Sequence, residues 1–276
     1  MAGFINYNGE IFDGEKSIIH ASDHSYRYGD GLFETMKVVK GSILLEEYHF
    51  ERLFAGLETL KFKSKAFFTK QKINAEVKEL CKKNKLEESA RVRLSISRGS
   101  GGLYDCNDKF SYLIESWALG QNDPALNGNG LVIDIFPDAR KSIDKFSNLK
   151  SANYLPYVMA ALWAKENKLN DALILNQHNR ICDATIANIF WVKSESLFTP
   201  PLNEGCVAGV MRKRILDLDQ DITEKNMAED DLLNADEVFL TNATSGVRWV
   251  KQFRDKTYDK KIAEKVFAQL IQTISP

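Results

Sequence analysis

A polar stretch near the middle of the chain constrains the fold more than any other feature of the sequence. Residues 119–128 (LGQNDPALNG) combine glycine, asparagine and proline, which favour turns over regular structure. Hydrophobic periodicity typical of strands and helices occurs before this stretch and starts again after it. In a chain of 276 residues, such an interruption indicates a linker between two domains. We therefore expect a small α+β domain over residues 1–118 and a larger domain over residues 129–276.

The first half is expected to contain two hairpins, two helices and two further strands. Asn8-Gly9 is a favoured two-residue turn and lies between residues 4–7 and 11–12, which read as strands. A second hairpin is expected around Lys40-Gly41. The other elements expected before the linker are strands over residues 35–39, 42–45, 92–97 and 110–117, and helices over residues 46–60 and 69–83.

The second half is expected to mix helices and strands without regular alternation. The helix over residues 154–165 is predicted to bury Leu155, Val158, Met159 and Leu162. The other expected elements are strands over residues 131–136, 172–175, 189–192 and 238–241, and helices over residues 209–218 and 260–274. Because the strands come in clusters, the pattern favours the α+β class.

Composition excludes several functional classes. The net charge of −1 gives no support for binding to nucleic acid or to an anionic membrane. No apolar run approaches the length of a membrane span, and no secretory signal is visible, so we expect a cytoplasmic protein. The histidines lack zinc-ligand spacing, and we expect no metal site. Reduced thiols are expected at the four cysteines, which form no Cys-x-x-Cys pair: Cys81, Cys106, Cys182 and Cys206.

A lysine and a carboxylate in the second half suggest cofactor chemistry. Lys150 precedes an expected helix, and Asp183 lies in the run CDATIANIF of residues 182–190. A lysine amine can form a Schiff base with a carbonyl, and a pyridoxal cofactor needs an acidic partner for its pyridine nitrogen. Most lysines in such positions are only solvated, so the two residues alone do not decide the function.

Five other runs each allow a functional and a structural interpretation. Residues 27–35 (RYGDGLFET) form a tight turn or a site of close backbone approach. Arg52 lies on an expected helix, where it would bind a phosphate or remain on the surface. Residues 97–102 (SRGSGG) are a flexible loop in which Arg98 would suit a substrate carboxylate. Residues 209–212 (GVMR) begin a helix whose N–H groups could bind phosphate, and residues 241–246 (TNATSG) could complete that site.

In their order and spacing, these runs resemble the fold-type IV pyridoxal-phosphate enzymes, the class IV aminotransferase family. This family includes branched-chain and D-amino acid transaminases and aminodeoxychorismate lyase. The resemblance covers essentially the whole chain, and its most specific parts are residues 27–35, Lys150 with Asn153, residues 183–190 and residues 209–212. It implies a two-domain α+β fold, pyridoxal 5'-phosphate as the cofactor, a small-molecule substrate and a homodimer.

The resemblance also implies roles for individual residues. Lys150, carried by the C-terminal domain, matches the Schiff-base lysine, and Asp183 stands where the family usually has glutamate. Phe33 and Arg98 match substrate-binding positions. The other positions that match cofactor-binding residues of the family are Arg52, Tyr154, Asn188, Gly209, Val210, Met211, Asn242 and Ala243.

The resemblance leaves the reaction open between a lyase and a transaminase. Residues 97–102, residues 209–212 and Asn242-Ala243 look more like aminodeoxychorismate lyase, which releases pyruvate and 4-aminobenzoate for folate synthesis. A branched-chain or D-amino acid aminotransferase is the main alternative. A weakly active or non-catalytic relative is a third, because aspartate at position 183 is one methylene shorter than glutamate. Without the resemblance, the chain would be an unspecified α+β binding module.

Overall fold

The computed structural model describes residues 3–63, 66–104, 110–119 and 126–274, and these form two compact units. The first unit contains the described residues up to 119 together with the segment Leu149–Asn153, and the second contains the rest. Much of the expected linker, and Cys106, lie outside the described residues. Each unit has its own hydrophobic core.

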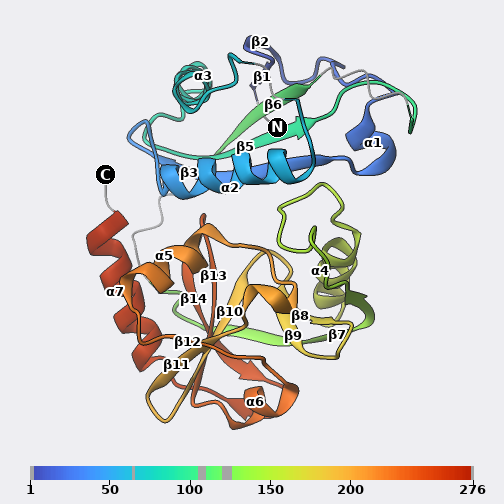
Figure 1. The fold of residues 1–276 in the computed structure, drawn as a ribbon. Helices are drawn as coiled ribbons and strands as arrows, with labels where there is room; N and C mark the ends of the chain where they lie inside the picture. Colours follow the sequence, from blue (N-terminus) through green and yellow to red (C-terminus); the bar gives the residue numbers. More distant parts are fainter. Residues whose placement is uncertain (1–2, 64–65, 105–109, 120–125, 275–276) are drawn as a thin grey trace. The chain divides into compact units, whose positions relative to one another are not determined.

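The first unit is built on a six-stranded antiparallel sheet with the strand order β2-β1-β6-β5-β3-β4 (Figure 1). Its strands are β1 (Phe4–Tyr7), β2 (Glu10–Asp13), β3 (Gly31–Val39), β4 (Ser42–Ile43), β5 (Ser89–Ser97) and β6 (Ser111–Ala118). Both predicted hairpins are confirmed. Asn8 and Gly9 have φ angles of 55° and 93° between β1 and β2, the left-handed conformation that a tight hairpin turn requires.

Three helices accompany this sheet, of which the second and third were predicted from the sequence and the first was not. They are α1 (His24–Tyr28), α2 (Glu46–Thr59) and α3 (Lys70–Lys83). The apolar face of α2, which includes Leu53 and Leu57, packs into one core with Ile73 and Val77 of α3 and with the sheet. The Thr69 side chain caps α3 by accepting a hydrogen bond from the N–H of Lys72, at 3.3 Å.

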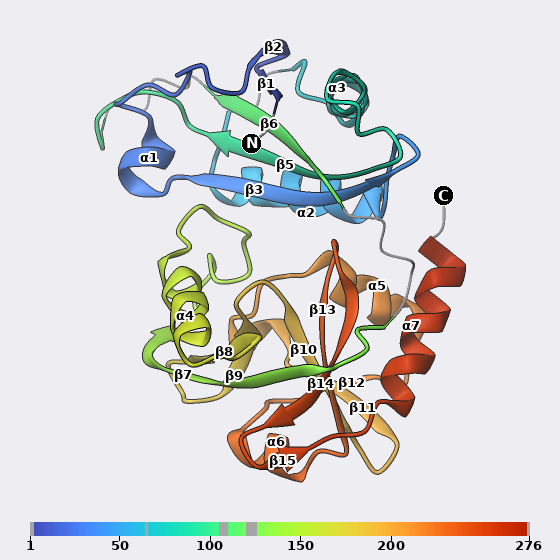
Figure 2. The same ribbon diagram turned by 180° about the vertical axis from the view of Figure 1, so that it is seen from behind.

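The second unit contains a nine-stranded mixed sheet with the order β12-β11-β10-β13-β14-β7-β8-β9, in which β15 pairs with β14 (Figure 2). The strands are β7 (Leu131–Lys141), β8 (Asp171–Asn176), β9 (Ile181–Ala184), β10 (Asn188–Lys193), β11 (Ser196–Thr199), β12 (Thr223–Glu224), β13 (Glu237–Asn242), β14 (Gly246–Phe253) and β15 (Lys256–Thr257). The helices are α4 (Leu155–Glu166), η1 (Leu202–Glu204), α5 (Val210–Leu218), α6 (Glu229–Asn234) and α7 (Lys261–Ile274). Short β9, buried at all four positions, was not predicted because it shows no alternation.

The prediction that α4 buries its leucine stripe was wrong. Leu155, Val158, Met159 and Leu162 are 66%, 48%, 46% and 48% exposed. The buried face of α4 instead presents Tyr157, Ala160 and Ala164, and the helix packs on β7 and β8. The helix is apolar on more than one face, so periodicity could not show which face meets the sheet, and small alanines allow the closer approach.

The segment around Lys150 belongs to the first unit, although the sequence placed it in the C-terminal domain. The N–H of Phe33 donates to the carbonyl of Lys150 at 2.9 Å, and the N–H of Ala152 donates to the carbonyl of Gly31 at 2.8 Å. Leu32 and Ser151 form an isolated antiparallel bridge. These hydrogen bonds fix the segment to the start of β3, a long-range pairing that local periodicity does not reveal.

Two searches of the described residues gave negative results. None of their helices combines the length and apolar character needed to cross a membrane. Nor do the described residues bring three or more histidine, cysteine, aspartate or glutamate side chains together as a metal site would require.

Candidate active site

Lys150 lies beside the residue predicted to line the substrate pocket. Its Nζ is 4.6 Å from the centroid of the Phe33 ring. The backbone hydrogen bond between the same two residues fixes this arrangement. Phe33 is buried, and the guanidinium of Arg93 lies 3.8 Å from the centroid of its ring. The sequence predicted Lys150 and Phe33 as site residues, and the structure brings them together.

Arg52, the predicted phosphate ligand of the first unit, forms a bidentate ion pair with Glu34. Its Nε donates to Oε1 at 2.8 Å and its Nη2 donates to Oε2 at 2.5 Å. The Nδ1 of His49 lies 2.6 Å from the same Oε2. Burial alone would raise the pKa of Glu34, but the positive charges of Arg52 and then His49 outweigh it and lower this pKa to about 2. Glu34 therefore stays ionised and orients the guanidinium.

Arg98, predicted to meet a substrate carboxylate, is engaged by Asp30. Its Nε and Nη2 donate to the two carboxylate oxygens of Asp30 at 2.7 Å and 3.0 Å. Its Nη2 also donates to the carbonyl of Leu60 at 2.9 Å, and the guanidinium lies 4.2 Å from the centroid of the Phe62 ring. These contacts fix the loop after β5, and a substrate contact for Arg98 stays a prediction.

Asp183, the predicted partner of the pyridine nitrogen, is almost fully buried on β9 and accepts hydrogen bonds from four donors of the second unit. Its Oδ2 accepts from Lys141 Nζ at 2.9 Å, from the hydroxyl of Tyr157 at 2.7 Å and from the N–H of Val207 at 3.0 Å. Its Oδ1 accepts from Asn188 Nδ2 at 3.1 Å. Burial, and then the charge of Asp183, raise the pKa of Tyr157 well above its ordinary value, so the phenol stays protonated and donates.

Tyr154 belongs to the same neighbourhood. Its hydroxyl donates to the carbonyl of Thr185 at 2.8 Å. Its ring stacks on Tyr157, with the two centroids 4.4 Å apart and the planes 19° from parallel. Tyr154 is thus linked to Asp183 through Tyr157, and its predicted contact with the cofactor stays a prediction.

The start of α5 has the features of a phosphate-binding helix terminus. Gly209 is its N-cap, and no side chain caps the helix. A Cβ at Gly209 would overlap with the Oδ1 of Asn188, so only glycine fits there without a shift. Val210 and Met211 follow as the first helical residues, and backbone N–H groups at such an end favour an anion.

The end of β13 and the turn that follows it add a buried hydroxyl and a polar side chain to the second unit. Thr241 pairs with Asn188 across the sheet, and its buried Oγ1 has no hydrogen-bond partner within the described part of the chain. The side chain of Asn242 closes the turn by accepting from the N–H groups of Thr244 and Ser245, at 3.0 Å and 2.7 Å. Glycine at the helix start and an unpaired buried hydroxyl fit the phosphate of a pyridoxal cofactor.

Sequence reasoning missed the residues that hold the predicted ones in place. These are Glu34, His49, Lys141 and Tyr157. One signal was available for His49, because it lies three residues before Arg52 and therefore on the same helical face. Glu34 lies within the candidate run of residues 27–35, although no role was assigned to it. Lys141 and Tyr157 are distant in sequence from Asp183, and no local pattern marks them.

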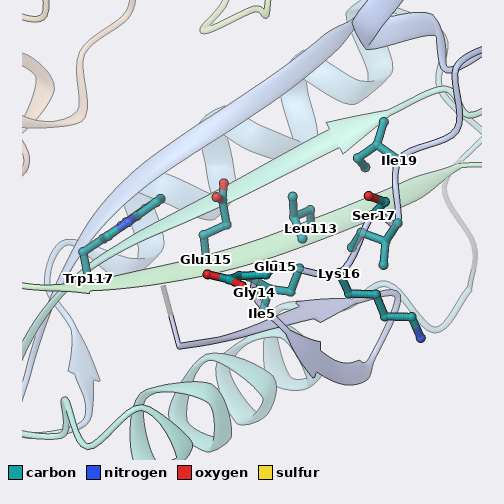
Figure 3. A pocket seen from close by; sticks show the side chains of 10 residues that line it. Ile5, Gly14, Glu15, Lys16, Ser17, Ile19, Leu113, Glu115 and Trp117 are labelled. Carbon is teal, nitrogen blue, oxygen red and sulfur yellow. The ribbon is translucent and has the colours of Figure 1, made fainter. Parts of the chain in front are cut away.

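A cavity of about 460 Å³ lies on the first unit (Figure 3). Leu113, Glu115 and Trp117 of β6 line it together with Lys16 and Ile19 of the segment after β2. The alternate residues of β6, Tyr112 and Ile114, point into the core instead. None of the predicted site residues lines this cavity.

Comparison with known proteins identifies the family. The chain matches the amino-transferase class IV family over residues 31–253, and it belongs to that family. It is 31% identical over 234 residues to aminodeoxychorismate lyase of Vibrio harveyi, covering 82% of this chain and 83% of the relative. It is 27% identical over 252 residues to a putative branched-chain-amino-acid aminotransferase of Methanocaldococcus jannaschii, covering 88% and 85%.

A solved structure supports the same fold. The branched-chain amino acid aminotransferase of Escherichia coli superposes with a TM-score of 0.88 at 20% identity, covering 100% of this chain and 95% of the other. The prediction of a fold-type IV enzyme is therefore confirmed. The protein is a pyridoxal-phosphate-dependent lyase or aminotransferase, with pyridoxal 5'-phosphate (PLP) as its cofactor.

Proposed function

We propose that this enzyme is a 4-amino-4-deoxychorismate lyase, which releases pyruvate and leaves 4-aminobenzoate, a precursor of folate. The observation that carries the proposal is the 31% identity with the Vibrio harveyi lyase, which extends over most of both chains. The Asn242-Ala243 pair supports it, because the transaminases of the resembled family usually have Gly-Thr there.

Lys150 carries the central chemistry in this proposal. When bound, PLP supplies an electron sink that stabilises negative charge at the substrate carbon. The Nζ of Lys150 would hold the cofactor and would move protons as general base and acid. Phe33, fixed to Lys150 by a backbone hydrogen bond, offers the substrate an apolar surface and helps to exclude water.

The remaining predicted residues bind and orient the cofactor. The N–H groups of Val210 and Met211, the Asn242-Ala243 turn and Arg52 bind the phosphate. Asp183 would stabilise a protonated pyridine nitrogen, and Asn188 donates a hydrogen bond to Asp183 and leaves room only for glycine at position 209. Tyr154 would contact the phenolic oxygen of the cofactor. Arg98 binds the substrate carboxylate from the loop after β5.

An aminotransferase acting on branched-chain or D-amino acids is the second candidate. The match to the Methanocaldococcus jannaschii protein, at 27% identity over 88% of this chain, favours it. A weakly active relative is the third, favoured by Asp183, whose shorter side chain is already bound by four donors.

The exposed stripe of α4 supports a homodimer. Leu155, Val158, Met159 and Leu162 follow one another at i, i+3, i+4 and i+7, so they form a continuous apolar strip. Exposed apolar patches of this kind mark interaction sites, and a second copy of the chain is the partner that the resemblance implies.

Three buried free thiols, at Cys81, Cys182 and Cys206, suit the reducing cytoplasm that we also infer.

A paired assay on the PLP-loaded enzyme tests the proposed reaction. We expect pyruvate and 4-aminobenzoate from 4-amino-4-deoxychorismate, and no amino transfer from branched-chain or D-amino acids to 2-oxoglutarate. Amino transfer without pyruvate release would overturn the lyase proposal in favour of the aminotransferase. Neither product would favour the weakly active relative.

Replacement of Lys150 tests its role within the same assay. Lys150→Ala should lower kcat by a factor of about 10³ or more, because attachment and proton transfer are both lost. Lys145→Ala is the matched control, since Lys145 is an exposed lysine five residues earlier. Equal activity of the two variants would show that Lys150 is not the catalytic lysine.

A further inference from the structure

One oxygen of the Asp183 carboxylate, Oδ2, is fully occupied by donors of the protein itself. A carboxylate offers about four lone-pair positions, and Asp183 accepts four hydrogen bonds. Three of them converge on Oδ2, which makes this oxygen the crowded one. Any further donor that approaches Oδ2 must therefore compete with a donor already present, whereas Oδ1 accepts one hydrogen bond, from Asn188.

Three of the four donors are fixed in place. The N–H of Val207 is part of the backbone. Asn188 is held because its Nδ2 also donates to the carbonyl of Val207, at 2.9 Å. Tyr157 is buried and stacked on Tyr154. None of these groups can move away without disturbing the packing around it.

Lys141, the fourth donor, is the one that can move. It is the last residue of β7, and its ammonium sits at the end of a flexible four-carbon side chain with three rotatable donors. Its side chain is 11% exposed, against 2% for that of Asp183, so the pair is buried and close to neutral overall. A protonated pyridine nitrogen would bring a second positive charge to the same carboxylate, and the two cations would repel each other.

We propose that Lys141 is a positioning residue that pairs with the buried carboxylate of Asp183 and competes with the pyridine nitrogen of PLP for it. The proposal rests on the proposed contact between Asp183 and that nitrogen. Lys141 supplies the positive charge that a buried carboxylate needs, and it withdraws from Oδ2 when the cofactor provides that charge. Lysine suits this role because its ammonium binds as a single point charge, whereas the guanidinium of arginine is planar and binds a carboxylate through two hydrogen bonds at once.

The proposal predicts an unusual result for the variant Lys141→Met. Removing the competing cation should strengthen PLP binding, with a dissociation constant lower by about five-fold or more. The variant without PLP should melt at a lower temperature than the wild type, because Asp183 is left buried without its cation. Added PLP should then raise the melting temperature more for this variant than for the wild type.

The experiment measures PLP dissociation constants by absorbance titration, and melting temperatures with and without PLP. Lys193→Met is the matched control, because Lys193 pairs with Asp236 at 3.2 Å on the surface, and its values should equal those of the wild type. Unchanged or weaker PLP binding by Lys141→Met would overturn the proposal. The proposal would also be overturned if Lys141→Met lowered the melting temperature by the same amount with and without PLP, because an equal decrease indicates a purely structural role.

Two further variants keep the test decisive. If Lys141→Met does not fold, Lys141→Arg serves in its place and should still fold. It should bind PLP several-fold more weakly than the wild type, because a guanidinium forms two hydrogen bonds to a carboxylate and is harder to displace. Wild-type affinity in Lys141→Arg would then contradict the proposal. Asp183→Asn tests the underlying contact separately: unchanged PLP affinity there would show that Asp183 does not hold the pyridine nitrogen.

Discussion

Each unit of the protein buries a carboxylate beside a cation, but the two pairs are built differently. Glu34 in the first unit and Asp183 in the second are both 2% exposed at the side chain. Glu34 is held by Arg52, whose planar guanidinium donates to both carboxylate oxygens. Asp183 meets only a single ammonium, from Lys141, and takes its other hydrogen bonds from neutral groups.

The geometry of each pair decides what its carboxylate is suited to do. A bidentate arginine pair is rigid, and its cation cannot be deprotonated in a protein. The Glu34 pair is therefore suited to fixing the direction of the Arg52 guanidinium. A lysine pair has one movable contact, so Asp183 is suited to exchanging one positive charge for another. The predictions below test this contrast.

The largest expected effect is on stability when the first pair is broken. Glu34→Gln should lower the free energy of unfolding by about 3–5 kcal/mol, because Arg52 and His49 would be left buried beside a neutral amide. Urea denaturation measures the change. Glu47→Gln is the control, since Glu47 is an exposed partner of Lys70, and its effect should stay below about 1 kcal/mol. A similar small value for Glu34→Gln would mean that its ion pair is not a stabilising contact.

Acid should remove the same contribution gradually. The pKa of Glu34 is lowered from 4.5 to about 2 in the folded protein, so its contribution is present above pH 4.5 and is lost as pH falls toward 2. The shift corresponds to about 3 kcal/mol. Urea denaturation of the wild type and of Glu34→Gln at several pH values measures this contribution. The difference between their free energies of unfolding should become smaller below pH 4.5. A difference in the free energy of unfolding that does not change with pH down to pH 3 would contradict the assigned ion pair.

The smallest expected effect concerns a neutral donor of the second pair. Tyr157→Phe should cost about 1–2 kcal/mol in the free energy of unfolding, because a hydrogen bond to a charged acceptor is lost. Tyr154→Phe is the matched control, since its hydroxyl donates to an uncharged carbonyl, and it should cost about 1 kcal/mol or less. Urea denaturation of both variants tests the order, and the reverse order would show that Asp183 does not depend on Tyr157.

Local signals in the sequence were sufficient for most elements of the fold. Asn8-Gly9 predicted the first hairpin, and the apolar face of residues 46–60 predicted α2, because turn chemistry and periodicity act over a few residues. The same reasoning failed for α4, where two apolar faces compete and only contact with β7 and β8 decides between them. It also could not place Lys150, whose backbone pairs with residues more than one hundred positions away.

Candidate site residues were predictable only through resemblance to a family. Lys150, Arg52 and Asp183 stand at matching positions, whereas the sequence does not show which residues lie beside them in space. Glu34 and Arg52 are 18 positions apart, and Lys141 and Asp183 are 42 positions apart. Such pairs depend on strand register and on the crossing of chain segments, which a single sequence does not specify.

The central claim, that Lys150 is the lysine that holds PLP, can be tested by trapping that covalent bond. The PLP-loaded protein would be reduced with borohydride and digested, and its peptides analysed by mass spectrometry. We predict one labelled peptide, with the pyridoxyl group on Lys150, and no such label in Lys150→Ala. A label on another lysine, such as Lys141 beside Asp183, or no label on the wild type, would contradict the account.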